Sequence, residues 1–188
     1  MMLKILISNF GFKEVFSGKM DKLFLLIYQL NYYFEYFLKD TFLYKILAQN
    51  EINIHEFADK WFTTLFSYNI KNEKVLRIYD MFLAQGWEFI IKFSIKILRK
   101  FSYIFKSKDC LDQIGDYFEN FFGKVTLTED FFTFGKDYEE ISTKKLESLE
   151  KEFYLSVINF ETTMINNSYS KITQGKSREK YSKIKRIY

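Results

Sequence analysis

Several residue types are scarce in this chain of 188 residues, and each scarcity excludes a class of protein. The single cysteine, Cys110, excludes an intrachain disulfide framework and fits a reducing compartment. With only one histidine, His55, the chain has too few clustered ligands for a zinc site, and it contains no glycine-rich phosphate loop. We therefore expect no metal and no cofactor. Proline is absent and glycine occurs 7 times, which favours long helices over a turn-rich β fold.

Long apolar runs are also missing. The strongest candidate, Trp87–Leu98, is interrupted by Glu88, Lys92 and Lys96, so the sequence predicts no membrane-spanning helix. The first residues are apolar but lack a small-residue cleavage site, and we do not interpret them as a signal peptide. The expected location is cytoplasmic, with at most a peripheral association with membranes.

Apolar residues make up 48% of the chain and aromatic residues 21%, which is unlike a disordered sequence. A chain of this length can bury roughly 70% of the surface that it exposes when unfolded. There is no internal repeat and no linker long enough to divide it. The sequence therefore predicts one folded domain over residues 1–166, followed by a solvated tail over residues 167–188.

The positive charge is concentrated in that tail. Between Gln174 and Tyr188 only Glu179 is acidic, and the cations are Lys176, Arg178, Lys180, Lys183, Lys185 and Arg186. The net charge of this segment is +5, whereas that of the whole chain is +4. The net charge of the other residues is therefore −1. The six cations are candidates for weak contact with an anionic membrane surface. The alternative is a solvated tail with no specific partner. Nucleic acid is not expected, because few aromatic residues are interleaved with the cations.

Hydrophobic periodicity predicts an all-α fold, an array of amphipathic helices with short connections. In chain order the predicted helices are Lys19–Leu38, Thr41–Gln49, Ile54–Ser67, Glu73–Gln85, Trp87–Lys106, a helix from Ser107 or Asp109 to Gly123, Glu129–Phe134, and a long last helix capped by Ser142. Asn53 and Glu56 have the spacing of a capping box, and Gly86 occupies the position of a left-handed C-terminal cap.

One segment, from Ala58 to Leu98, carries an ordered set of motifs. They are Trp61-Phe62, Leu65-Phe66, Leu76-Arg77-Ile78-Tyr79-Asp80 and Gln85-Gly86-Trp87. These motifs and their spacing resemble the C-terminal signature of TBC domains, which are found in Rab GTPase-activating proteins. The resemblance covers roughly Phe10 to Val157. Tyr79 replaces the commoner Trp and Gln85 the commoner acidic residue, which indicates a divergent member.

The resemblance implies structural roles for the signature residues. Helical spacing places Trp61, Phe62, Leu65 and Phe66 in the core. Trp87 is expected to be structural as well. Arg77 and Asp80 are three residues apart on a helix and are expected to pair side chain to side chain. An arginine finger at Arg77 is the less favoured interpretation.

The family's catalytic motifs do not occur among these residues. In TBC proteins an arginine and a glutamine act in trans, in Ile-x-x-Asp-x-x-Arg and Tyr-x-Gln-Gly motifs that lie in the N-terminal half of the domain. The arginines of this chain are at positions 77, 99, 178 and 186, and none has an aspartate three residues earlier. The chain begins about where the family helix after the glutamine motif would lie. We therefore expect it to be non-catalytic by itself.

Two functions are consistent with this pattern. In the first, the chain is the C-terminal lobe of a Rab GTPase activator, and it binds a Rab-type GTPase or completes a catalytic lobe supplied elsewhere. In the second, it is a structural subunit of a larger assembly that keeps the fold without the activity. Both imply another protein chain covering the apolar face that a lone half exposes. An incomplete gene product is the third possibility.

Overall fold

The computed structural model describes residues 10–17, 21–68, 70, 73–105, 127–160 and 162–163. Throughout these ranges the regular structure consists of α-helices and 3-10 turns, with no strand. The all-α prediction is therefore confirmed. The chain divides into two compact units, Met1–Glu147 and Ser148–Tyr188. The predicted boundary at residue 166 lies outside the described residues.

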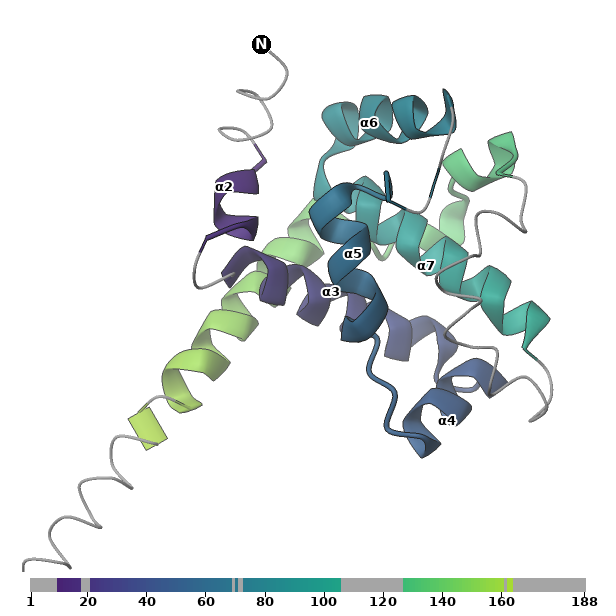
Figure 1. The fold of residues 1–188 in the computed structure, drawn as a ribbon. Coiled ribbons are helices and arrows are strands. Elements are labelled where there is room, and N and C mark those ends of the chain that lie inside the picture. Colours follow the sequence, from purple (N-terminus) through teal and green to yellow (C-terminus); the bar gives the residue numbers. More distant parts are fainter. Residues whose placement is uncertain are drawn as a thin grey trace, which may run out of the picture. The chain divides into compact units, whose positions relative to one another are not determined.

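Two long helices form the centre of the first unit (Figure 1). Helix α3 spans Asp21–Leu38 and α7 spans Trp87–Ile104, and the two pack against each other over much of their length. Helix α7 has a continuous apolar face. Its residues are all fully buried, namely Phe89, Ile90, Phe93, Ile97, Leu98 and Phe101. This face and the buried face of α3 form the core.

Shorter helices pack around this pair. Helix α2, Phe12–Val15, and helix α5, His55–Thr64, both pack on α3. Helix α4, Phe42–Gln49, contacts both α3 and α7, and its first turn is capped by the Thr41 hydroxyl, which accepts a hydrogen bond from the Tyr44 backbone N–H at 3.3 Å. Helix α6, Glu73–Gln85, has the predicted bounds and packs on α7.

Helix α5 begins at His55, one residue after the predicted start, and it ends early. The Glu56 carboxylate accepts from the Asn53 N–H at 3.4 Å, which is one half of the predicted capping box. The other half is absent, because the Asn53 side chain accepts from the His55 N–H at 3.0 Å while the Glu56 N–H donates to the Asn53 carbonyl. The predicted end at Ser67 is wrong, because Leu65 and Phe66 have positive φ values of 46° and 64°. Left-handed backbone is unfavourable for these residues. Their nearly complete burial offsets that cost.

Gly86 separates α6 from α7 with φ 65° and ψ −149°. The positive φ was expected, but this ψ lies outside the left-handed helical region predicted for a cap. The combination is almost restricted to glycine, because a Cβ strains it. It turns the chain sharply enough for α7 to start at the next residue, Trp87.

The segment after residue 126 differs from its prediction. In place of a helix over Glu129–Phe134 the chain forms two 3-10 turns, η2 at Glu129–Phe132 and η3 at Lys136–Tyr138. Thr128 precedes η2 but makes no side-chain cap hydrogen bond. The last helix includes residues 143–160 and 162–163, and the Ser142 hydroxyl caps its start by accepting from the Lys145 N–H at 3.4 Å. The predicted helix ending at Gly123 lies outside the described residues.

Among the described helices, none is long and apolar enough to cross a membrane.

Candidate functional site

The signature aromatics form one cluster in the core. The Trp61 ring stacks on Phe66 at 5.4 Å between centroids, and Phe66 meets Phe93 of α7 edge-on at 5.0 Å. Phe62 lies edge-on to Trp87 at 6.4 Å. Trp61, Phe62 and Phe66 are almost fully buried, as is Leu65. These side chains hold α5 against α7, which is a packing role and leaves none of them available to a substrate.

Trp87 connects this cluster to the beginning of the described chain. Its indole Nε1–H donates a hydrogen bond of 2.7 Å to the Phe10 carbonyl. Its ring stacks on Phe12 at 5.5 Å and meets Phe82 of α6 at 5.0 Å. Trp87 therefore joins α2, α6 and α7, and its position directly after Gly86 places the ring at their junction.

Arg77 does not pair with Asp80 as predicted. Its guanidinium Nη2 lies 2.5 Å from the Glu129 carboxylate, and its Cζ lies 4.9 Å from the centre of the Phe132 ring. Both partners belong to η2, more than 50 residues away in sequence. Asp80 is exposed on α6. Helical spacing permits an Arg77–Asp80 pair, but at η2 the guanidinium makes two contacts instead, an ion pair with Glu129 and a cation–π contact with Phe132.

Four cationic side chains of α6 and α7 hold the segment Leu127–Tyr138, which we call the strap. Besides Arg77, the Lys74 ammonium donates to the Leu127 carbonyl at 2.5 Å. Lys96 donates to the carbonyls of Asp130 and Thr133, the latter at 2.7 Å, and lies 3.4 Å from the Asp130 carboxylate. The Asp130 carbonyl also accepts from the Thr133 N–H at 3.3 Å, so Lys96 adds a donor to it and provides the Thr133 carbonyl with its hydrogen bond.

Arg99 is the fourth of these cations. It pairs with the Asp137 carboxylate and lies between two rings, with its Cζ 4.7 Å from the centre of Phe37 and 4.8 Å from that of Tyr138. Burial favours the neutral guanidinium, but the hydrogen bond to Asp137 outweighs it, so the pKa of Arg99 is raised. Burial raises the pKa of Tyr138 as well. Both groups keep their ordinary charge states at neutral pH.

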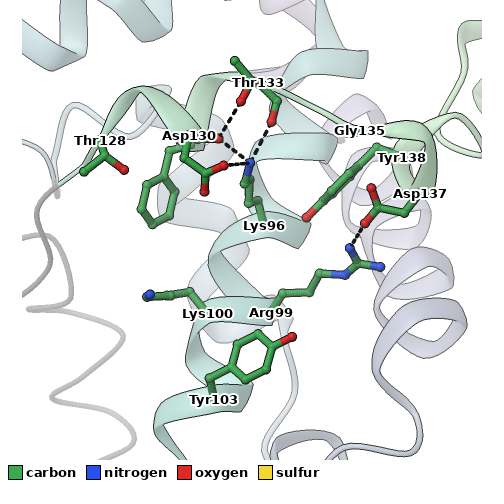
Figure 2. A pocket seen from close by; sticks show the side chains of 11 residues that line it. Lys96, Arg99, Lys100, Tyr103, Thr128, Asp130, Thr133, Gly135, Asp137 and Tyr138 are labelled. Atoms are coloured by element: carbon green, nitrogen blue, oxygen red, sulfur yellow. Dashed lines mark hydrogen bonds and ion pairs between the residues drawn. The ribbon is translucent and has the colours of Figure 1, made fainter.

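A cavity of about 750 Å³ opens between α7 and the strap (Figure 2). Its wall contains three cations, Lys96, Arg99 and Lys100, against the two carboxylates of Asp130 and Asp137. Lys100 is exposed, and the described part of the chain provides no ion-pair partner for it.

Glu88 links α7 to the last helix. Its Oε2 accepts hydrogen bonds of 2.7 Å from both the N–H and the hydroxyl of Thr143, and its Oε1 lies 2.6 Å from the Lys92 ammonium. Burial alone would raise the pKa of Glu88, but the hydrogen bonds from Lys92 and Thr143 outweigh it, and the pKa is lowered. The carboxylate is an anionic cap for the first turn of the last helix.

Two buried polar groups of α3 complete this junction. The Gln29 Nε2 donates to the Leu146 carbonyl at 2.9 Å, and the Tyr33 hydroxyl donates to the Glu140 carbonyl at 3.0 Å. Burial, followed by the neighbouring charges, raises the pKa of Tyr33. Sequence reasoning missed Glu88, Gln29 and Tyr33. A polar residue on an otherwise apolar helix face was the available signal for Gln29.

The remaining predicted site residues have the following positions. His55 is partly buried at the first turn of α5, and its ring stacks on Phe24 at 6.0 Å. The six cations of the tail and Cys110 lie outside the described residues. Within the described ranges, no group of three His, Cys, Asp or Glu side chains is arranged to hold a metal.

A family model of the RabGAP TBC domain matches residues 1–170. The chain belongs to the RabGAP TBC domain family. The resemblance carried by the Trp61–Trp87 motifs is thereby confirmed at the level of the family. The aromatic cluster, the α6–α7 turn and the strap are consequently features of a TBC fold in this chain.

The curated relatives agree. The chain is 27% identical to mouse TBC1 domain family member 1 over 154 residues, which is 82% of this chain and 12% of that protein. It is 34% identical over 95 residues to the yeast GTPase-activating protein GYP5, covering 50% of this chain and 10% of that protein. Mouse TBC1 domain family member 4 is 25% identical over 169 residues. The chain thus spans only about a tenth of the length of these relatives.

Proposed function

We propose that this chain is the non-catalytic, C-terminal lobe of a Rab GTPase-activating module. In this role it supports a catalytic lobe supplied elsewhere and helps to bind a Rab-type GTPase. Membership of the TBC family supports the GTPase as partner, and GTPase activation is named in the yeast relative GYP5. The two catalytic motifs do not occur in the 188 residues.

The observation that carries the proposal is the placement of Arg77 and Arg99. A catalytic arginine must reach a GTPase in trans and enter its phosphate site. Arg77 is paired with Glu129 and lies over Phe132, while Arg99 is paired with Asp137 between two rings. Each would have to leave a carboxylate and an aromatic ring to act. Both arginines therefore serve the strap in this proposal.

The test is single-turnover GTP hydrolysis by a panel of Rab proteins. The full chain alone is expected to leave the rate unchanged within about twofold. A fusion to the N-terminal half of a related TBC domain, carrying both motifs, is expected to restore acceleration, since an arginine finger contributes on the order of 10³–10⁵ in rate. Replacing the motif arginine by alanine in the fusion provides the matched control.

Two other results are informative. A hundredfold acceleration by the chain alone would contradict the proposal, and Arg77→Ala and Arg99→Ala variants would then locate the finger. A folded fusion that binds no Rab and accelerates none would favour the second candidate, a structural subunit. The packing role of the signature residues suits that candidate as well. Trp61, Phe62 and Phe66 are buried in the core, so another protein cannot reach their side chains.

A further inference from the structure

The outward face of the central helix α3 carries a row of four aromatic side chains, which we call the α3 row. They follow one another at intervals of about one helical turn and are Phe24, Tyr28, Tyr32 and Tyr36. Phe24 and Tyr36 are 45% and 54% exposed, and the two tyrosines between them are partly exposed. Most of the other side chains of α3 are buried in the core. Adjacent exposed aromatic side chains with polar residues around them are typical of a surface that binds a protein.

Ring contacts hold the α3 row in place. Tyr32 and Tyr36 stack with 6.5 Å between their centroids. At the other end of the row, the Phe24 ring stacks on His55 of α5 at 6.0 Å. Because these rings are already positioned by their neighbours, a partner that docks on them loses little side-chain entropy.

Lys145 shows which chemical group the row accepts. Its ammonium lies 4.9 Å from the centre of the Tyr32 ring, close enough for attraction between a cation and the face of an aromatic ring. Lys145 lies at the start of the last helix and belongs to the first compact unit, as α3 does. Tyr36 stacks on Tyr32 and is the more exposed of the two, so a cation from another protein can reach its ring.

The charges of this face favour a cationic partner. The exposed residues of α3 are Asp21, Phe24, Asn31, Glu35 and Tyr36. The face therefore has two carboxylates and no cation. Lys22, the only cation of the helix, is partly buried beside Gly11. Lys39 and Asp40 follow the helix, and their charges cancel.

Each carboxylate adjoins a ring of the α3 row. Asp21 precedes Phe24 by three residues and Glu35 follows Tyr32 by three, and positions three apart are neighbours on a helix. The described part of the chain provides no ion-pair partner for Glu35. The face thus combines aromatic rings with carboxylates, the two groups that attract a guanidinium.

We propose that the α3 row is a docking surface for an arginine-bearing segment of a partner protein. Arginine side chains of that segment stack on the exposed rings and pair with Asp21 and Glu35. Arginine suits this face better than lysine, because its planar guanidinium both stacks on rings and binds carboxylates. The inference concerns a partner contact and does not depend on whether the chain supports GTPase activation.

The test is titration of the full chain with a hexa-arginine peptide at low salt, followed by the amide chemical shifts of the protein. We expect the largest shift changes at the amides of α3 and of His55, which contacts the row. A hexalysine peptide of the same charge should bind more weakly, because an ammonium does not stack as a guanidinium does. Equal affinity for the two peptides, or shift changes that spare α3, would overturn the proposal.

A double variant removes the two most exposed rings of the row. Each exposed contact between a cation and a ring changes affinity by about two- to fivefold, so Phe24→Ser with Tyr36→Ser should weaken hexa-arginine binding by roughly fivefold or more. The matched control is Phe16→Ser with Tyr103→Ser, whose side chains are 61% and 71% exposed elsewhere in the first unit. The control should bind as the wild type does. Equal losses in the two double variants would contradict the proposal.

A gain of affinity provides the sharper test. Lys145→Gln and Lys144→Gln each remove one positive charge from the start of the last helix, but only Lys145 covers the Tyr32 ring. We expect Lys145→Gln to bind hexa-arginine about two- to fivefold more tightly than Lys144→Gln, because the uncovered ring accepts a guanidinium. Loss of folded protein would not imitate this result. Equal affinities would mean that the rings do not hold the cation, and the proposal would be wrong.

Discussion

At the scale of single residues, the side chains that organise this lobe are polar groups whose partners are distant in sequence. Glu88 receives hydrogen bonds from Thr143, 55 residues away, and Gln29 donates to a carbonyl 117 residues away. Neither hydrogen bond could be predicted from hydrophobic periodicity, because its two residues belong to different elements that are far apart in the sequence. By contrast, the hydrogen bond from the Asn53 N–H to the Glu56 carboxylate was predictable because it spans three residues.

Glu88 makes stability depend on acid pH. Its pKa is lowered in the folded state, so its contribution is present above the unfolded value of about 4.5 and is lost as the pH falls through the folded value. We expect Glu88→Gln to lower the free energy of unfolding by about 1–2 kcal/mol at pH 7, as for loss of a charged hydrogen bond. The difference from the wild type should shrink steadily below pH 4.5.

Urea unfolding followed by circular dichroism between pH 3 and pH 7 measures this difference. Glu139→Gln is the control, because Glu139 is an exposed carboxylate that precedes the same helix. It should leave stability unchanged at both ends of the range. A Glu88→Gln effect that is equally large at pH 3 would mean that the carboxylate charge is not the cause.

Two glycines with positive φ should respond differently to the same substitution. Gly11 has φ 66° and ψ 28°, a left-handed helical conformation that asparagine tolerates. Gly86 has φ 65° and ψ −149°, which is almost restricted to glycine. We expect Gly86→Asn to cost about 1–3 kcal/mol of unfolding free energy, and Gly11→Asn less than about 1 kcal/mol. Similar costs in urea unfolding would refute the backbone explanation.

At the scale of elements, the long helices were predictable and the strap was not. Helix α6 has the predicted bounds, and the buried face of α7 follows from its 3.6-residue period. The strap reads locally as a short helix from Glu129. It forms two 3-10 turns because Lys96 donates hydrogen bonds to two of its carbonyls, those of Asp130 and Thr133, and Arg77 forms an ion pair with Glu129. These partners come from other helices, which a local pattern does not include.

The strap should therefore depend on Lys96 more than on its neighbour Lys100. Replacing Lys96 with Met removes the donor to the Thr133 carbonyl and the ion pair with Asp130, which should cost about 1–3 kcal/mol of unfolding free energy. Lys100→Met removes an exposed cation from the same helix and should change stability by less than about 0.5 kcal/mol. Thermal or urea unfolding measures both. Equal effects would show that Lys96 is not holding the strap.

At the scale of the whole molecule, the family could be predicted although the site could not. The spacing of Trp61, Leu65, Arg77 and Trp87 was sufficient to identify the TBC family, because aromatic packing positions recur in order along the chain. The partners of Arg77 and Arg99 follow from the path of the strap, which the sequence does not determine locally. The same motifs that identify the family are buried, so they indicate the fold more directly than the activity.

Ending the chain after Phe153 tests how the helix end contributes to the molecule. Every described residue from Tyr154 to Phe160 is exposed, while the buried Leu146 and Leu149 are retained. We therefore expect the free energy of unfolding to change by less than about 0.5 kcal/mol, as measured by urea unfolding. A loss of several kcal/mol would instead mean that the apolar helix end packs within the folded protein.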